Sequence, residues 1–363
     1  MSDVPLRPPV AATPSLAELR RRYAAAFQPN PWIYWIDLLA SVVVGWGAFA
    51  AAAISPFGSA WHVAATFLAT VALLRASIFI HELAHKKRGT LPGFEVAWNL
   101  LVGIPLMLPS LMYVGSHAEH HRRSVFGTNA DPEYVPLAHW SRARIVGFVW
   151  TVAVLPPAMA LRWGVLGPLS YVFPPLRQLA VGRLSTLLIN SSYRRPMPTG
   201  RQARRWAVQE AATCAFFWLV VWAVWRGSLP WTWLVQWWIV GAGILVTNQV
   251  RTLAAHGYAN EGEELDSTGQ LLDSINLRST SLLTRLAAPV GMRYHALHHF
   301  MPSVPYHSLA TLHRRLLAEL PSAAPYRHTE RKSILRVVAG LLGFGDGGAL
   351  QDELDVSADR AAG

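Results

Sequence analysis

The sequence is poor in cysteine and in charge. Cys214 is the only cysteine among 363 residues, which excludes an intramolecular disulfide framework and any zinc or iron–sulfur site built from cysteines. Charged residues make up 15% of the chain, against roughly 25% in an ordinary soluble domain. Hydrophobic residues reach 52%, which excludes a disordered chain. The composition therefore predicts a membrane protein.

The balance of charge is strongly basic, with 32 Lys and Arg against 21 Asp and Glu, a net charge of +11. In an apolar chain such an excess is typical of a face that lies against anionic lipid, and we predict no nucleic-acid partner. Residues 1–30 carry Arg20, Arg21 and Arg22 without an apolar run. They therefore do not form a secretory signal peptide, and we expect a polar N-terminal tail.

Four apolar runs are each close to the ~20 residues that an α-helix needs to cross ~30 Å of hydrocarbon. We expect membrane spans at about 36–54, 61–80, 206–225 and 231–250. Tryptophan and tyrosine cluster at the ends of these runs, as in the aromatic belts of membrane proteins. The fold class predicted is an all-α integral membrane protein with about four transmembrane helices and a helical cytoplasmic cap.

Two further apolar stretches, 97–114 and 145–161, each contain two prolines. We interpret them as interfacial or re-entrant segments, or as hairpins that return to the same side of the membrane. The membrane domain then covers residues 31–320, and residues 321–363 are expected to form a partly disordered C-terminal tail.

The distribution of Lys and Arg predicts the orientation. The link at 55–60 has neither residue and the link at 226–230 has only Arg226, whereas most other flanks of the runs are basic. The positive-inside rule places those basic flanks in the cytoplasm. We expect a multi-pass protein of a bacterial inner membrane.

Nine of the fourteen histidines lie in four places, and the predicted topology puts all four on the cytoplasmic side. They are His81 and His85; His117, His120 and His121; His256; and His295, His298 and His299. Positions i, i+3 and i+4 share one face of a helix, so each cluster aims its imidazoles at one region. Imidazole suits zinc, copper, iron and nickel. Nine such ligands exceed the capacity of one ion, so the pattern predicts a dimetal site.

The sequence His81–His85 also matches the HExxH pattern of zinc metalloproteases, in which Glu82 would be the general base. That interpretation leaves the two HxxHH clusters without a purpose. A histidine-lined metal transporter is disfavoured because the clusters lie at the ends of the spans and not within them.

Three of these motifs, HELAH (81–85), HAEHH (117–121) and HALHH (295–299), resemble the histidine boxes of the membrane fatty acid desaturase and hydroxylase family. GTNADPEY (127–134), RTLAAHGY (251–258) and YHALHHFMPSVPYHSL (294–309) are also similar to family segments. The resemblance covers roughly residues 30–320. It implies two iron ions held by the nine histidines. One departure is Thr252, which stands where the family has an Asn that helps to hold a water; the nearest upstream Asn is Asn248.

Metal-binding imidazoles are normally held by hydrogen bonds from a second layer of side chains. The candidates for this role are Glu82, Glu119, Asp131, Glu133, Asn260, Glu261, Asp273 and His307. We regard Glu119, inside the second box, as the best of them. The remaining histidines, His62, His139, His313 and His328, are assigned no role.

The resemblance implies oxidation of an unactivated C–H bond in a fatty-acyl chain, with O2 as co-substrate. Fatty acid desaturation is favoured; hydroxylation of a fatty acid or alkane, and oxidative decarboxylation to a terminal alkene, are the alternatives. The acyl substrate, carried by a lipid, an acyl carrier or a free acid, would lie in a tunnel under the metals, with Trp98 and Trp150 as candidate lining residues.

The electrons for such a reaction must come from outside the chain, because the sequence has no flavin, nicotinamide or haem motif. We expect a ferredoxin, a rubredoxin or a cytochrome with its reductase as the donor. The basic residues Lys86, Lys87, Arg88, Arg122 and Arg123 are candidates for docking an acidic carrier.

Overall fold

The computed structural model describes residues 15–344, except Arg88 and Leu188. Two long helices, α2 (Pro31–Ile54) and α3 (Ala60–His85), form a hairpin. The side chain of Asn30 caps α2, with Pro31 at its first position, and that of Ser59 caps α3. The hairpin packs closely because Gly45 has no side chain; a Cβ there would lie 2.7 Å from Leu73.

An irregular segment follows the hairpin, composed of α4 (Phe94–Trp98), the π-turn η2 (Asn99–Gly103), the 3-10 turn η3 (Ser110–Met112) and α5 (Val114–His120). It contains no helix long enough to cross a membrane. Its unpaired carbonyls accept hydrogen bonds from indoles: Trp46 Nε1 donates to Leu101 O at 2.8 Å, and Trp237 Nε1 to Pro105 O at 2.9 Å. Irregular backbone inside an apolar bundle requires such partners.

Residues 142–170 form one helical run of 29 residues that is apolar and long enough to cross a membrane. It consists of α6 (Arg142–Thr151), η5 (Val152–Val154), α7 (Leu155–Leu161), η6 (Arg162–Leu166) and α8 (Gly167–Ser170). From the sequence, 145–161 was expected to be an interfacial or re-entrant segment, or a hairpin that returns to the same side of the membrane. However, Pro156 falls in the first turn of α7, where a missing N–H costs little.

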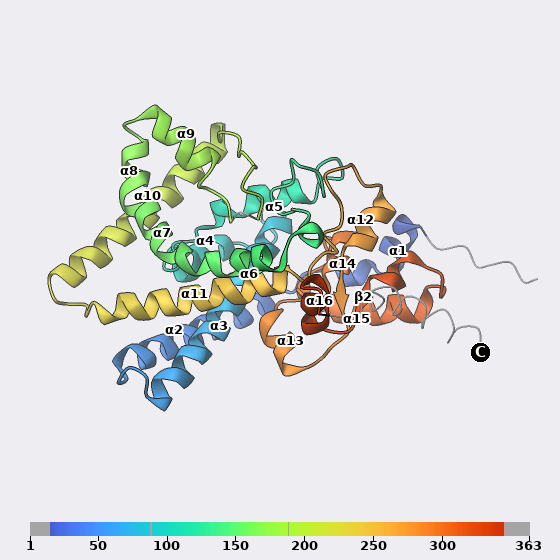
Figure 1. Ribbon diagram of the computed structural model, residues 1–363, viewed down its shortest axis with the longest axis horizontal. Helices are drawn as coiled ribbons and strands as arrows, with labels where there is room; N and C mark the ends of the chain where they lie inside the picture. The colour runs from blue at the N-terminus through green and yellow to red at the C-terminus, as the bar shows by residue number, and fades with distance from the viewer. Residues whose placement is uncertain (1–14, 88, 188, 345–363) are drawn as a thin grey trace, which may run out of the picture.

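Among the described residues, four helical stretches qualify as candidate spans: α2, α3, the 142–170 run and α10 (Gly200–Trp225). The expected number is confirmed, but one member differs. The predicted fourth span forms α11 (Thr232–Thr252), whose polar residues Gln236, Asn248 and Gln249 lower its hydropathy. In Figure 1, α10 and α11 leave their connecting loop in diverging directions, and α11 runs beside α3.

The remaining elements gather at the end of the molecule to which the C-terminal ends of α3 and α11 lead (Figure 1). This cap contains α1 (Leu16–Arg22), η1 (Ala24–Phe27), α12 (Ser267–Asp273), α13 (Leu282–Ala287), α14 (His295–Phe300), α15 (Tyr306–Glu319), η7 (Pro325–Thr329), α16 (Ile334–Leu341) and the parallel strands β1 (Asn276–Leu277) and β2 (Glu330–Arg331). Two further elements are η4 (Leu137–His139) and α9 (Pro174–Gly182).

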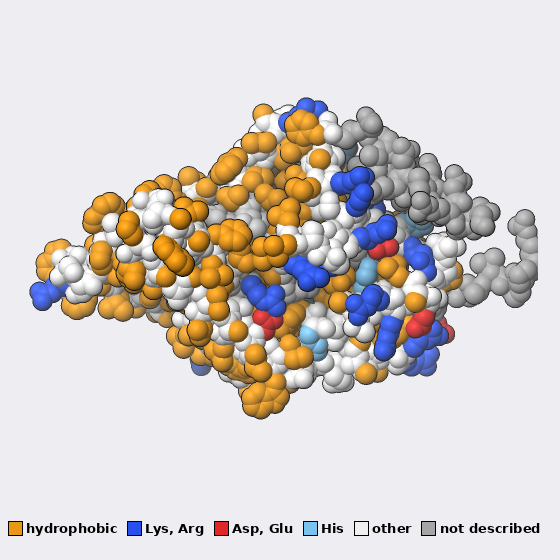
Figure 2. All heavy atoms as spheres, turned by 90° about the horizontal axis from the view of Figure 1, so that it is seen from below, with side chains coloured by type: hydrophobic (Ala, Val, Ile, Leu, Met, Phe, Trp, Pro, Cys, Tyr) orange, Lys and Arg blue, Asp and Glu red, His pale blue; other side chains and the backbone are white. Residues whose placement is uncertain are grey.

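Both expected tails contribute to this cap. Leu19 and Tyr23 are buried in the core, as are Tyr326 and Ile334, and β2 pairs with β1. The folded part therefore extends into the region predicted as tail at each end, while residues 1–14 and 345–363 lie outside the described residues. Figure 2 shows hydrophobic side chains covering the end formed by the long helices, and most Lys and Arg gathered towards the cap. This is the surface expected of a membrane protein with a basic cap.

A buried ion cluster holds α9 and η6 against α10. The Glu210 carboxylate is fully buried and accepts from Arg162 at 2.9 Å, Arg177 at 2.6 Å and the Tyr171 hydroxyl at 2.8 Å. Removing one partner of a buried pair leaves the other charge uncompensated, which is costly.

We predict that Glu210→Gln lowers the free energy of unfolding by about 3–5 kcal/mol, because two arginines lose their counter-charge. The measurement is the thermal unfolding midpoint of the detergent-solubilised protein. Glu95→Gln is the matched control, since Glu95 pairs with Arg205 at a partly exposed site and such pairs contribute at most about 1 kcal/mol. Equal losses in the two variants would contradict the role assigned to Glu210.

Candidate metal centre

The structure brings the eight histidines of the three boxes and His256 together at the junction of the long helices and the cap. They form two groups in which the candidate ligand nitrogens all lie within 4.8 Å of one another. The first group contains His81, His85, His117, His121 and His298, and the second contains His120, His256, His295 and His299.

Each HxxHH cluster divides its histidines between the two groups. In the second box, His117 and His121 lie one turn apart and enter the five-histidine group, whereas His120 enters the four-histidine group. The third box is arranged the opposite way, because His295 and His299 enter the four-histidine group and His298 the other. The two helix segments therefore each contribute to both groups and hold them side by side.

The ring nitrogens face one another at short distances. His298 Nε2 lies 3.1 Å from His121 Nε2, and His295 Nε2 lies 2.9 Å from His256 Nε2. Nε2 of His81 and of His85 is buried without any hydrogen-bond partner. Buried polar atoms normally have partners, so these converging and unpartnered nitrogens fit a pair of bound metal ions.

The protonation of the imidazoles also suits metal ligands. Burial lowers the pKa of His298 and of His299 well below the usual value, and neighbouring imidazoles act in the same direction. The same holds for His117, His121 and His295. These rings are therefore neutral at physiological pH, which is the form that binds a metal.

Three carboxylates each lie beside the Nδ1 nitrogen of one histidine ring. Asp131 lies 2.9 Å from His120 Nδ1, Glu133 lies 3.0 Å from His117 Nδ1, and Asp273 lies 3.2 Å from His256 Nδ1. Each carboxylate keeps the proton on Nδ1 and turns Nε2 towards the centre of its group.

Asp131 is the most deeply buried of the three carboxylates. It is fully buried and also accepts from the backbone N–H groups of Gly127 and Glu133, both at 2.8 Å. Burial has the largest single effect on the pKa of His120 and lowers it. The charge and hydrogen bond of Asp131, together with the charges of Glu133 and Asp273, outweigh burial, and the pKa is raised. The ring is thereby a more basic ligand.

Two glutamates inside the histidine boxes lie elsewhere. The Glu82 carboxylate accepts from the Tyr34 hydroxyl and from the Tyr306 backbone N–H, which ties α3 to α2 and α15. Glu119 accepts from the Tyr193 hydroxyl at 2.6 Å. Neither carboxylate has a hydrogen bond to an imidazole among the described contacts, and the position of Glu82 does not suit the general base of a protease.

The remaining candidates, Asn260, His307 and Glu261, have no hydrogen bond to the nine histidines among the described contacts. The Asn260 side chain donates to Gly127 O and Glu263 O, both at 2.8 Å, and so supports the loop that carries Asp131. His307 Nε2 accepts from the backbone N–H of Asn30 at the start of α2. Glu261 lies on the surface.

Two polar residues near the centre were not predicted from the sequence. Tyr134 donates to Asp273 at 2.9 Å. Arg251 is buried and donates to Asn248 Oδ1 and Thr252 Oγ1, both at 3.1 Å. The Thr252 hydroxyl in turn donates to Asn248 O, so Thr252 is bonded within α11. Both residues lie in segments that resemble those of the family, 127–134 and 251–258, and this resemblance is the sequence signal that could have identified them.

Comparison with known proteins gives two matches. Residues 58–330 match the family model described as fatty acid desaturase. A ceramide hydroxylase of Caulobacter vibrioides is 40% identical over 317 residues, which cover 86% of this chain and 89% of that protein. The range matched by the family model includes the eight histidines of the boxes and His256.

We predict that the purified protein binds two transition-metal ions and that His256→Ala binds one, because His256 belongs only to the four-histidine group. The measurement is the metal content per chain by mass spectrometry. His139→Ala is the control, since His139 is exposed and belongs to neither group. Unchanged metal content in His256→Ala would contradict the assignment of this ligand.

We also predict that Asp131→Asn weakens metal binding by about 10–100-fold, because it loses the carboxylate that orients His120. A competition titration with a chelator measures the affinity. Glu119→Gln provides a comparison at a glutamate in the second box whose partner is a tyrosine. Similar losses in both variants would show that Asp131 has no special part in orienting the ligand.

Proposed function

We propose a reaction for this chain on the premise that it belongs to the fatty acid desaturase family, as the family model and the relative both show. Membership makes it an oxidoreductase of lipid metabolism with a histidine-rich metal site. Its apolar helices make it a membrane protein.

The specific activity that we propose is O2-dependent hydroxylation of a C–H bond in the acyl part of a ceramide. One observation carries this proposal: the relative named ceramide hydroxylase is 40% identical across nearly the full length of both chains. Desaturation of an acyl chain, which the sequence analysis favoured, is the second candidate, and the description of the family model favours it. Oxidative decarboxylation requires a free carboxylate, which an amide-linked chain lacks.

Iron is the metal that we propose for both groups of histidines. Removal of hydrogen from an unactivated C–H bond is beyond acid–base groups and requires a redox-active metal. Two iron ions would supply the activation of O2 and the oxidation of the substrate. Imidazole ligands suit iron, and the absence of box cysteines leaves histidine as the ligand type.

The residues around the rings fix the protons and the geometry. Asp131, Glu133 and Asp273 hold the Nδ1 protons of their histidines, so the Nε2 atoms remain free for the metals. Tyr113 stacks on His117, and Phe126 packs against His120, His256 and His299. This apolar packing excludes water from the rings and protects a reactive centre from side reactions.

The two electrons and two protons of each cycle must enter from outside. We propose a ferredoxin, a rubredoxin or a cytochrome with its reductase as the donor, docking on the basic cap. Lys87, Arg122 and Arg123 are exposed and available for an acidic carrier. Lys86 is directed inward, 3.5 Å from Glu82 and above the Tyr34 ring; Arg88 lies outside the described residues.

The placement that we propose is a bacterial inner membrane with the metal centre on the cytoplasmic side. The support is the separation of apolar and basic surfaces along the molecule (Figure 2). A cytoplasmic centre is within reach of soluble electron carriers.

Expression in a host fed with ceramide, together with the donor proteins, tests the reaction. We predict a product one oxygen atom heavier than the substrate, and no product with His298→Ala, which removes a ligand from the five-histidine group. Lipid mass spectrometry identifies the product, and His139→Ala is the active control. A product two hydrogens lighter would favour desaturation. Absence of any oxidised lipid from an iron-loaded protein with a working donor would refute both reactions.

A further inference from the structure

A cavity of about 410 Å³ lies at the end of the long helices opposite the metal centre. His62 of α3 lines it and precedes His81 by 19 residues on the same helix. At a rise of ~1.5 Å per residue the two positions lie about 28 Å apart along the axis, which is close to the ~30 Å of a hydrocarbon core. The cavity is therefore separate from the metal centre and lies at the opposite face of the membrane.

The walls of this cavity come from the last turn of α2, the link 55–60, the first turn of α3 and the first turn of α11. Its volume falls within the range of ~300–1,000 Å³ that is typical of ligand pockets. No Lys, Arg, Asp or Glu is among the described residues that line it. A charged ligand would bury its charge there without a partner, which is costly, so the lining favours an uncharged one.

A chain of hydrogen bonds is buried in one wall. The backbone N–H of Gly58 donates to His62 Nδ1 at 3.4 Å, and His62 Nε2 lies 3.0 Å from Gln236 Oε1. With Nδ1 as acceptor, Nε2 carries the proton and donates to Gln236. Gln236 Nε2 in turn donates to Thr66 Oγ1 at 3.0 Å. The chain therefore connects the link 55–60 with α3 and α11.

The Gln236 amide has capacity for further hydrogen bonds. It has two N–H groups and an oxygen with two lone pairs, and the contacts of the described residues use one of each. Gln236 lines the cavity and is only 3% exposed. Because buried polar groups are normally satisfied, a ligand with a hydroxyl or carbonyl group in the cavity would complete the set.

Exposed aromatic side chains mark the depth of this cavity in the bilayer. Phe57 is 78%, Trp61 80% and Trp231 66% exposed, and all three lie at this end of the helices. Such residues gather where the hydrocarbon core meets the lipid head groups. The polar wall of the cavity therefore lies at the level of the head group of a lipid in that leaflet.

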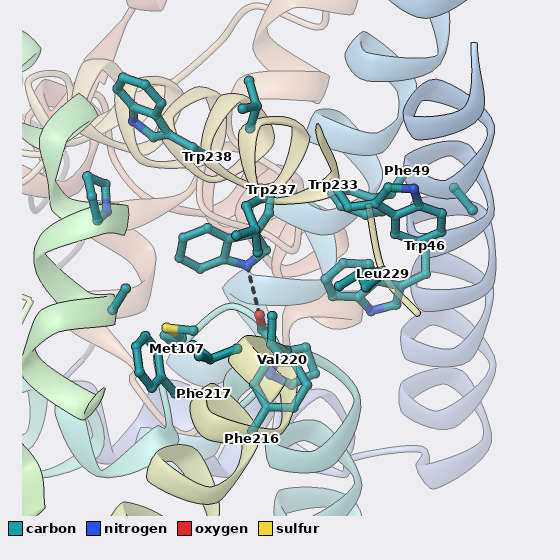
Figure 3. Close-up of a pocket in the computed structure, with 17 residues that line it drawn as sticks. Trp46, Phe49, Met107, Phe216, Phe217, Val220, Leu229, Trp233, Trp237 and Trp238 are labelled. Carbon is teal, nitrogen blue, oxygen red and sulfur yellow. Dashed lines mark hydrogen bonds between the residues drawn. The ribbon is translucent and has the colours of Figure 1, made fainter. Parts of the chain in front are cut away.

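A second cavity, of about 640 Å³, adjoins the first at Val235, which lines both. Figure 3 shows its aromatic walls: Phe49 of α2 and Trp233 of α11 lie on one side, and Phe216 and Phe217 of α10 on the other. No charged side chain is among the described residues that line it. A polar cavity beside an apolar one fits an amphipathic molecule.

We propose that this end of the molecule is a second lipid site, which binds an uncharged lipid of the diacylglycerol type. The hydroxyl-bearing head lies in the 410 Å³ cavity and forms hydrogen bonds with Gln236, while the hydrocarbon lies against the adjoining apolar walls. The site is about one hydrocarbon thickness away from the histidines. It is therefore additional to the place of the proposed reaction, and binding there needs no turnover.

Photolabelling tests this site. The probe is a diacylglycerol with a diazirine near the ester end of one acyl chain, added at a sub-saturating amount to the full-length protein in phosphatidylglycerol nanodiscs. We expect labelling of peptides that contain Ser55 or Trp231. Thr232→Trp fills the cavity from the start of α11 and should remove most of this labelling. Ala51→Trp, at an exposed position of α2 that lines neither cavity, should leave it unchanged.

The role of the amide is tested with Gln236→Leu, which keeps the size of the side chain and removes its hydrogen-bonding atoms. We expect labelling to fall about fivefold, the effect of losing one ordinary hydrogen bond. His298→Ala should label like the unaltered protein, because the metal centre has no part in this site.

Equal labelling in Thr232→Trp and Ala51→Trp would overturn the proposal. Equal labelling of the same peptides by a phosphatidylglycerol that carries the same diazirine would also overturn it, because a site for an uncharged head would then not discriminate against a charged one. Ala53→Phe, which fills the same cavity from α2, replaces Thr232→Trp if that variant does not fold, as judged by metal content and thermal unfolding.

Discussion

The whole molecule is organised around nine imidazoles, six buried and three half-buried, whose ring nitrogens converge. Burial lowers the pKa of His117, His121, His295, His298 and His299. Lone pairs of ring nitrogens 3.1 Å apart repel one another unless a proton or a cation lies between them. The ends of α3, α5 and α14 must therefore be held together by other interactions. Glu82 binds α3 to α2 and α15, and Asp131 and Asp273 connect the loop after α5 and the end of α12 to the rings. The cap therefore holds the ring nitrogens close together although their lone pairs repel one another.

Much of this centre could be predicted from the sequence because it depends on helical periodicity. The i, i+3 and i+4 spacing is a local property, and it identified eight of the nine histidines; His256 was identified by its place just after the fourth apolar run. Their division into groups of five and four depends on how α5 and α14 cross, which no local pattern records. The same distinction explains the carboxylates. Glu119 lies inside a box yet contacts Tyr193, while Asp273 is distant in sequence yet lies beside His256. Tertiary packing, and not proximity in sequence, selects the partner.

The membrane part shows a similar limit. Hydropathy identified the α2–α3 hairpin and α10, whose apolar faces are long and uninterrupted. It was less informative where the chain combines proline or polar residues with apolar ones, as in the 142–170 run and α11. Prolines interrupt a helix only when they fall after its first turn, and their position within α7 emerges only once the helix boundaries are known. The sequence predicted the tryptophans only as aromatic belts. Several of them also donate hydrogen bonds to backbone carbonyls of the irregular segment 99–107.

The short parallel pairing of β1 with β2 has a consequence for biogenesis. β2 lies near the end of the described chain, whereas β1 lies between His256 and the third histidine box. During synthesis, α3 enters the membrane with His81 and His85 long before the segment that secures the cap has left the ribosome. His81 and His85 are then made before the cap is complete. A chain that stops short of β2 lacks the β1–β2 pairing, which holds the segment just before the third histidine box. The cap can therefore close around the histidines only after the segment that carries β2 has been made.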